Sequence, residues 1–242
     1  MSKLAIIAAD LVEIAPLVKR WKHTQQVAQR HTVEIFENGD VVAGFAGMGA
    51  VPARIATDTI YKHCDGQAQA IFSVGYAGAL DPGLKIADLI QPKKIICAAD
   101  DTEIINSNGS GILVSAGAVA GSDAKKMIAK KHEADAVDME AYSVADVARI
   151  YGVPFRAIKV ISDEFDFPMP PMGRFIDDVG RFHKASFAIY SAMRPWIWGG
   201  VWMLARNSSR ATNVLCERLK HEIDLVTGKS SEPTLQPSAV SR

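Results

Sequence analysis

Two groups of carboxylates flank one short connection in residues 134–166, ADAVDMEAYSVADVARIYGVPFRAIKVISDEFD. Asp138-Met139-Glu140 precedes an Ala/Val-rich helical pattern, and Ser162-Asp163 follows the apolar run 155–161, which predicts a buried strand. In open α/β folds, ligands bind at the carboxyl ends of strands, and carboxylates held there can bind hydroxyl groups or transfer protons. This stretch is therefore the predicted active-site frame.

Each of these acidic residues also has a structural interpretation. Ser162-Asp163 could cap a helix, and Glu140 could be a first-turn carboxylate that the helix dipole favours. The same alternative holds for Glu13, which lies in the first turn of a helix that Asp10 is expected to cap. Their occurrence together favours a site.

The segments before residue 134 alternate between strand and helix patterns, which predicts an α/β domain with a largely parallel sheet. Asn38-Gly39 predicts a hairpin turn, and Gly47-Met48-Gly49 opens a helix in a way that brings backbone close to a ligand. The small residues of Gly75-Tyr76-Ala77-Gly78 would let a flat ligand lie against the backbone. The expected strands are residues 4–9, 31–36, 40–45, 69–74, 84–98 with a break at 91–92, and 112–114, and residues 100–111 are expected to form a loop. Three helices are expected: one that begins after Asp10, one over 52–64, and a lysine-rich one that ends at His132.

The part after residue 166 begins with a proline-punctuated loop, FPMPPMGRF, of a kind that covers sites, and continues with a helical pattern over 176–193. Residues 195–204, PWIWGGVWML, contain three tryptophans and are too short to span a bilayer. They are expected to pack on the body or on a second subunit, with a surface for membranes or apolar ligands as the alternative. One domain is expected over 1–226, with its core at 4–187, a helical extension at 188–226 that ends in an amphipathic helix over 207–226, and a disordered tail at 227–242.

The bulk composition excludes several classes of protein. The 27 basic and 27 acidic residues give a formal net charge of zero, which argues against nucleic acid as the main ligand. Three cysteines without CxxC spacing argue against a disulfide framework or zinc site and fit a reducing cytoplasm. The opening MSKLAIIAAD is expected to be a first strand rather than a signal peptide.

The segments AVDMEAYSVADVA and VPFRAIKVISDEFD resemble the nucleoside phosphorylase and nucleosidase superfamily, as do AIIAADLVE, AGMGAVPARIAT and FSVGYAGALDPGLKIADLI. The likeness covers about residues 4–187 and is nearest to methylthioadenosine/S-adenosylhomocysteine nucleosidases and hopanoid-associated phosphorylase-like proteins. It implies a three-layer αβα fold around a mixed, barrel-like sheet, a homodimer, and cleavage of an N-glycosidic bond without metal or organic cofactor.

The resemblance also implies roles for particular residues. Asp163 would protonate purine N7, Glu140 would bind the ribose hydroxyls, and Glu13 would activate a water. The remaining residues expected to contact the substrate are Met48, Tyr76, Ala77, Gly78, Val119, Met139 and Ser162. Asp163 can donate a proton only in its neutral form, which burial and the neighbouring carboxylates Glu140, Glu164 and Asp166 would favour.

Hydrolysis is favoured over phosphorolysis because the positions that hold phosphate in phosphorylases lack arginine. Ser73 stands at the strand position, Glu13 on the first loop would repel phosphate, and Arg54 is the nearest candidate clamp. The predicted activity is hydrolysis of a 5′-modified adenosine, including lipid-linked ones, to release adenine. A phosphate-dependent phosphorylase and a non-catalytic nucleoside-binding module are the alternatives.

Overall fold

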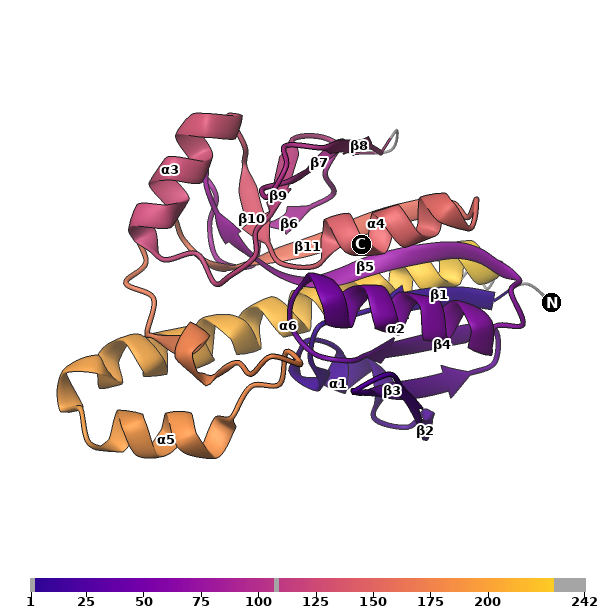
Figure 1. Cartoon of the computed structure of the whole chain (residues 1–242), viewed down its shortest axis with the longest axis horizontal. Coiled ribbons are helices and arrows are strands. Elements are labelled where there is room, and N and C mark those ends of the chain that lie inside the picture. The colour runs from indigo at the N-terminus through magenta and orange to yellow at the C-terminus, as the bar shows by residue number, and fades with distance from the viewer. Residues whose placement is uncertain (1–2, 107–108, 229–242) are drawn as a thin grey trace, which may run out of the picture.

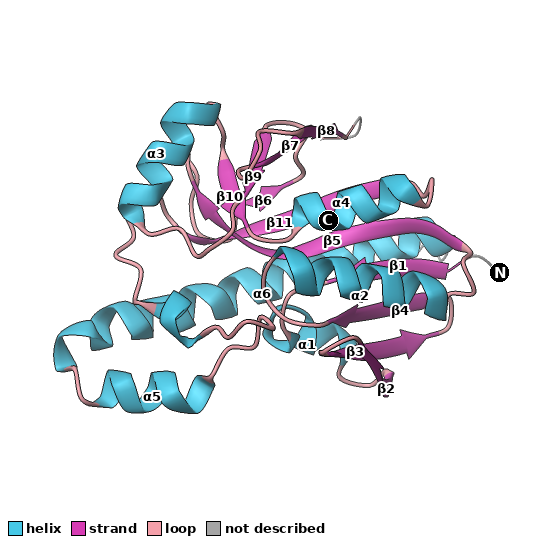
Figure 2. Ribbon diagram, in the orientation of Figure 1, coloured by secondary structure: helices cyan, strands magenta, loops and turns pink. Residues whose placement is uncertain are grey.

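The computed structural model describes residues 3–106 and 109–228, which form a mixed sheet flanked by helices (Figures 1 and 2). The strands are β1 (Lys3–Ile7), β2 (Lys22–Ala28), β3 (His31–Asn38), β4 (Val41–Phe45), β5 (Ala68–Ala79), β6 (Leu89–Ile90), β7 (Lys94–Cys97), β8 (Glu103–Ile105), β9 (Ile112–Ser115), β10 (Ala136–Asp138) and β11 (Phe155–Asp163). The helices are α1 (Leu11–Val18), α2 (Ala50–His63), α3 (Ser122–His132), α4 (Ala141–Ile150), α5 (Lys184–Ala192) and α6 (Trp198–Thr227), with short 3₁₀ turns at Met172–Phe175 and Pro195–Ile197.

Strand β5 is the centre of the sheet. It pairs in parallel with β1 on one side and with β11 on the other, and its last residues pair antiparallel with β10. The order along the sheet is β2-β3-β4-β1-β5-β10-β9-β7-β8, with β11 joined to β5 and β6. The mixed, layered α/β architecture is confirmed, and the barrel-like closure of the sheet stays a prediction.

The continuous apolar runs of the central strands are explained by burial on both faces. In β1, Leu4 and Ile6 belong to a core that includes α1 and α6, whereas Ala5 and Ile7 belong to a second core that includes α2 and α4. Because side chains alternate between the faces of a strand, one short segment anchors both helical layers.

Two local predictions are confirmed at the level of hydrogen bonds and strand pairing. The Asp10 side chain accepts from the backbone N–H of Val12 at 3.0 Å and caps α1 in a capping box with Glu13. The chain reverses at Asn38-Gly39 between β3 and β4, which pair antiparallel. The sequence therefore places the start of the first helix and the hairpin of β3 and β4 correctly.

Other boundaries differ from the predictions. Strands β2, β8 and β10 were not expected, β5 continues through the small residues to Ala79, and 84–88 is not strand. The helix expected from residue 176 begins at Lys184, and the tryptophan-rich stretch is continuous with the last helix as α6. The expected disordered tail lies almost wholly at 229–242, outside the described residues. Within 3–106 and 109–228, no helix combines the length and apolarity needed to cross a membrane.

The tryptophans of the stretch 195–204 do not pack on the body of their own chain, while the alternative of packing on a second subunit stays a prediction. Helix α5, the 3₁₀ turn and the first turns of α6 project from the sheet as a helical hairpin, residues 184–210 (Figure 1). Trp196 and Trp202 are 77% and 63% exposed. The second half of α6 returns to the body, where Ala211, Leu215 and Leu219 are buried in the core beside β11 and α1.

Candidate active site

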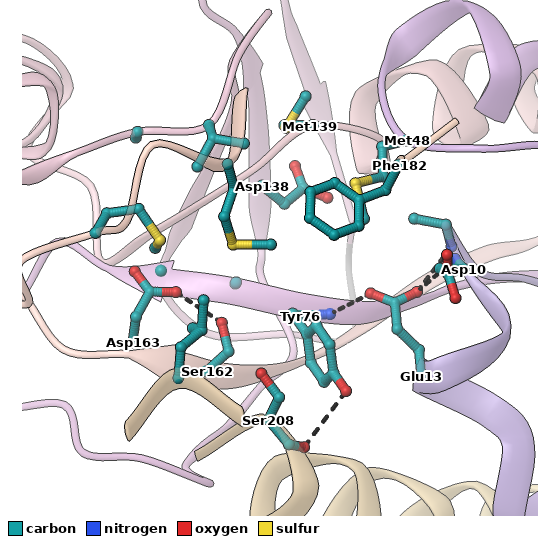
Figure 3. Close-up of a pocket in the computed structure, with 18 of the residues that line it drawn as sticks. Asp10, Glu13, Met48, Tyr76, Asp138, Met139, Ser162, Asp163, Phe182 and Ser208 are labelled. Carbon is teal, nitrogen blue, oxygen red and sulfur yellow. Dashed lines mark hydrogen bonds between the residues drawn. The ribbon is translucent and has the colours of Figure 1, made fainter. Parts of the chain in front are cut away.

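A cavity of about 350 Å³ lies at the carboxyl ends of β5 and β11 (Figure 3). All ten predicted site residues line it, namely Glu13, Met48, Tyr76, Ala77, Gly78, Val119, Met139, Glu140, Ser162 and Asp163. They come from six separate parts of the chain. The fold therefore brings together the residues that the sequence nominated, while their roles remain predictions.

Glu13 is held by backbone donors from two segments. Its Oε2 accepts from the N–H of Ala9 at 2.7 Å and of Asp10 at 3.4 Å, and its Oε1 accepts from the N–H of Tyr76 at 2.9 Å. Burial raises the pKa of Glu13 above its usual range, against the opposing effects of Lys159 and of these three N–H groups. The result is a fixed carboxylate with increased proton affinity, as a general base requires.

Gly75 is required for this arrangement. Its φ of +133° is a conformation that L side chains rarely adopt. A Cβ at this position would lie 2.5 Å from Glu13 Oε1. The small residues at the end of the predicted strand thus make room for the catalytic candidates as well as for a ligand.

Glu140 connects α4 to the Gly-rich turn before α2. Its Oε1 accepts from the N–H of Gly49 at 2.7 Å, and its Oε2 accepts from the N–H of Met139 at 3.2 Å. Burial raises the pKa of Glu140 to about 7, and the charges of Asp138 and Glu13 add to this effect while Lys159 opposes it. Each oxygen keeps a lone pair for another donor.

A buried ion pair lies behind these carboxylates. Lys159 Nζ contacts Asp138 Oδ2 at 2.9 Å and donates to the carbonyl of Val74 at 3.3 Å. Asp138 also accepts from the Ser115 hydroxyl at 2.6 Å and from the N–H of Ala141 at 2.8 Å. Burial alone would lower the pKa of Lys159, but Asp138, Glu140 and Glu13 raise it. Lys159 is therefore a permanent cation among three carboxylates, and it offsets their mutual repulsion.

Asp163 has a partner that the sequence interpretation did not anticipate. Its Oδ1 accepts from the Ser162 hydroxyl at 2.7 Å, and its Oδ2 accepts from Lys125 Nζ. The Lys125 ammonium, whose residue is 1% exposed, also donates to the backbone carbonyls of Asp163 at 3.2 Å and Glu164 at 2.7 Å. The neighbour in contact with Asp163 is thus a cation and not the expected carboxylates.

Gly78 lies against this pair. A Cβ on Gly78 would come within 2.8 Å of both Asp163 Oδ2 and Lys125 Cε. Any larger residue at position 78 would displace the Asp163 carboxylate from the Lys125 ammonium. The glycine is therefore needed by the Asp163–Lys125 pair.

Glu13 and Asp163 lie on opposite sides of the cavity, with the Tyr76 segment of β5 between them (Figure 3). The Tyr76 hydroxyl lies 2.5 Å from Thr212 Oγ1 and donates to the Ser208 carbonyl at 3.3 Å, which ties β5 to α6. A ligand bound between the two carboxylates would contact one group able to take a proton and another attached to a proton donor.

The remaining side of the cavity is an apolar wall that the sequence interpretation did not assign to the site. It is made of Met169, Met172, Phe182, Phe187, Val201 and Leu204. The proline-punctuated loop supplies Met169 and Met172, so it lies at the cavity, as expected of a loop that covers a site. The other residues are Phe182, and Phe187, Val201 and Leu204 of the helical hairpin, which therefore forms part of the cavity.

Lys125 and Lys159 were not predicted as site residues, although the sequence around each of them indicates a buried lysine. Lys125 shares a helical face with the part-buried Ile128 and Ala129, which lie three and four positions further along. Lys159 lies between the apolar pairs Ala157-Ile158 and Val160-Ile161 of β11, and a buried lysine needs a partner. The identity of those partners was not readable from the sequence.

Arg54, the candidate phosphate clamp, is not at the cavity. It forms an ion pair with Asp146 at 2.6 Å on the surface between α2 and α4. No arginine is among the cavity-lining residues of the described part of the chain, and Ser73 is fully buried in β5. The solvated-face interpretation of Arg54 is confirmed.

The chain is similar to known nucleosidases. An aminodeoxyfutalosine nucleosidase from Campylobacter jejuni is 27% identical over 209 residues, which cover 69% of this chain and 90% of that protein. Among solved structures, a methylthioadenosine/S-adenosylhomocysteine nucleosidase and a futalosine hydrolase from Helicobacter pylori each match with a TM-score of 0.67 at 17% identity, over 93% of this chain and 98% of theirs. At this level of identity, the structural matches establish the fold.

The sequence model of the phosphorylase superfamily matches residues 3–109 and 109–186. This range includes every predicted site residue and excludes most of the helical hairpin. The family resemblance drawn from the sequence motifs is confirmed, and the chain belongs to the phosphorylase superfamily.

Proposed function

We propose that the protein is a nucleosidase that hydrolyses the N-glycosidic bond of a 5′-modified purine nucleoside and releases the base. The observation that carries this proposal is the placement of Glu13 and Asp163 on opposite sides of one cavity, with Glu140 also in its lining. Cleavage by water needs a proton donor at the leaving base and a proton acceptor at the attacking water, on opposite faces of the sugar.

On the base side, Asp163 and Lys125 would act together. Lys125 Nζ donates a hydrogen bond to Asp163 Oδ2. As the C1′–N9 bond breaks, the proton of this hydrogen bond passes through Asp163 to N7, so that the purine leaves as a neutral molecule. Glu13 takes one proton from the attacking water and releases it to solvent. Lys125 takes one proton back from solvent before the next turnover, so the protons balance.

On the sugar side, Glu140 would accept hydrogen bonds from the ribose hydroxyls with its free lone pairs. Its negative charge would also stabilise the oxocarbenium character that develops at C1′. Met139, the neighbouring cavity residue, would pack against the sugar.

Water is the proposed nucleophile because the cavity offers no arginine clamp. Phosphate is usually held by bidentate guanidinium groups, and Arg54 is engaged with Asp146 away from the cavity. Glu13 would repel a phosphate dianion at the place where it would have to attack.

The apolar wall of the cavity favours a nucleoside whose 5′ substituent is apolar. Methylthioadenosine and related 5′-thio nucleosides satisfy this condition, and a lipid-linked adenosyl compound satisfies it as well. Adenine is the proposed base. The relatives are named for aminodeoxyfutalosine, futalosine, methylthioadenosine and S-adenosylhomocysteine, which supports a 5′-modified nucleoside without selecting a member.

The test is product analysis with and without inorganic phosphate. Methylthioadenosine, S-adenosylhomocysteine, aminodeoxyfutalosine, adenosine and inosine are incubated separately, and the free base and sugar product are resolved by chromatography. We expect free base and reducing sugar at equal rates in both conditions. Sugar 1-phosphate formed only with phosphate would establish a phosphorylase instead, and an intact nucleoside recovered in a tight complex would establish a binding module.

Substrate binding is expected to depend on pH through Glu140, whose pKa is raised to about 7. Above this pH the carboxylate accepts from two hydroxyls, whereas below it the protonated group loses part of that capacity. Affinity for a 5′-alkylthio C-nucleoside, which cannot be hydrolysed, should weaken below pH 7 by up to about tenfold per pH unit. Isothermal titration calorimetry measures this slope.

Glu140→Gln is the matched control for the pH series. The variant should bind weakly at every pH, because the amide does not titrate and offers one acceptor oxygen. The same slope in wild type and variant would assign the titration to another group.

A further inference from the structure

The helical hairpin, residues 184–210, is a folded unit with an exposed apolar surface. Phe187 packs edge-to-face on Phe175 at 5.3 Å, and the indole N–H of Trp198 donates to the Ser191 carbonyl at 2.7 Å across the turn. Arg194 stacks 3.7 Å above the Tyr190 ring and donates to its carbonyl at 3.1 Å. These contacts hold the turn between α5 and α6 and leave Met193, Trp196 and Trp202 exposed.

The apolar side chains on this unit are concentrated at its tip. The exposed members within residues 189–203 are Ile189, Met193, Trp196, Trp198, Trp202 and Met203, of which Met193 is 71% exposed. Ile189 and Met193 share a face of α5, and Trp198 and Trp202 share a face of α6, because each pair is four residues apart. A concentration of this kind marks an interaction surface.

The charge on the hairpin selects the kind of partner. The chain as a whole is neutral, yet residues 184–210 contain Lys184, Arg194, Arg206 and Arg210 and no acidic residue. Lys184 lies 3.6 Å from Asp10. Arg206 and Arg210 are exposed, and the Arg206 guanidinium lies 5.6 Å from the Trp202 ring. Indoles flanked by arginines suit the boundary between lipid headgroups and acyl chains.

We propose that the tip of the helical hairpin docks on the surface of an anionic lipid bilayer. The tryptophans and Met193 would insert at the headgroup level, and Arg206 and Arg210 would contact anionic headgroups. A second copy of the chain fits less well, because a two-fold contact places the same cationic surface on both sides. The hairpin also supplies Phe187, Val201 and Leu204 to the cavity, so a docked molecule would hold one wall of its cavity at the membrane.

The test is flotation of the full chain with vesicles of mixed phosphatidylcholine and phosphatidylglycerol. We expect co-flotation that added salt weakens, a blue shift of the tryptophan emission, and much weaker binding to vesicles of phosphatidylcholine alone. Wild-type protein that stays unbound to the anionic vesicles, or that binds both kinds equally, would overturn the proposal.

The variant Met193→Ser/Trp196→Ser/Trp202→Ser separates insertion from a general effect of apolar surface. It should bind anionic vesicles at least about tenfold more weakly than wild type. The matched control, Val27→Ser/Ile105→Ser/Met127→Ser, removes similarly exposed side chains elsewhere and should bind as wild type does. Thermal unfolding of both variants checks that the fold is kept.

The variant Arg206→Gln/Arg210→Gln tests the contribution of charge. It should lose most of the preference for phosphatidylglycerol while keeping the residual binding to neutral vesicles. Equal binding by wild type and either hairpin variant would contradict the proposal. A concentration-dependent dimer, lost in the triple hairpin variant and seen without vesicle binding by wild type, would replace the bilayer by a second copy. These readouts measure binding, so they do not depend on the proposed reaction.

Discussion

Asp163→Asn is expected to lower kcat for base release by about 10²- to 10⁴-fold, with little change in nucleoside affinity. The amide keeps the size and the hydrogen bond to Ser162 but cannot pass a proton to N7. Single-turnover measurement of base release, together with calorimetric titration of an uncleavable analogue, separates the two effects. Equal loss of binding and turnover would mean that Asp163 holds the base without protonating it.

The Lys125 ammonium complicates this experiment because it is buried against the carboxylate. Removing one member of a buried ion pair lowers the free energy of unfolding by about 3–5 kcal/mol, so the stability of Asp163→Asn must be measured beside its activity. The double variant Lys125→Met/Asp163→Asn removes both charges. We expect it to recover much of the lost stability, measured by urea denaturation, and none of the turnover.

Lys125→Met alone tests the shared proton. Asp163 would then lose the hydrogen-bond donor at its Oδ2, so turnover should fall while affinity for an uncleavable analogue changes little. A variant with wild-type turnover in single-turnover base release would limit Lys125 to a structural role.

Glu13→Gln should likewise lower kcat by about 10²- to 10⁴-fold, because the amide cannot take a proton from water. Its NH₂ group would also face a backbone N–H at Ala9 or Tyr76, since all three hydrogen bonds to Glu13 come from donors. An unpaired buried donor costs about 1–3 kcal/mol, so unfolding must be measured beside activity.

Glu13→Ala offers a sharper experiment on the same role. It removes the carboxylate and opens space next to Gly75, where added formate can act as the base. We expect formate to restore turnover in Glu13→Ala and to have no effect on Asp163→Asn. In wild type, kcat/KM should fall on the acid side of the raised Glu13 pKa. Normal turnover by both Glu13 variants would assign the base to another residue.

The sequence by itself determined the elements whose signals are local. Asp10 caps α1 as predicted, with Glu13 in the first turn, and the turn at Asn38-Gly39 connects β3 and β4. The order of the carboxylate motifs along the chain was enough to assign the family and to nominate ten residues that line one cavity. Capping and turn chemistry involve residues a few positions apart, so they can be read without the fold.

Only the tertiary structure shows which distant segments pair with one another and which side chains they bury. Strand β2 is polar on both faces and exists through its pairing with β3, which no periodicity reveals. Helix α3 is rich in lysine, and only the fold shows that one of them, Lys125, donates to Asp163 across 38 residues. The tryptophans expected to pack on the body or on a second subunit are exposed on the helical hairpin of this chain. Burial and ion pairing depend on contacts between distant segments, and hydrophobicity along the chain does not encode which segments meet.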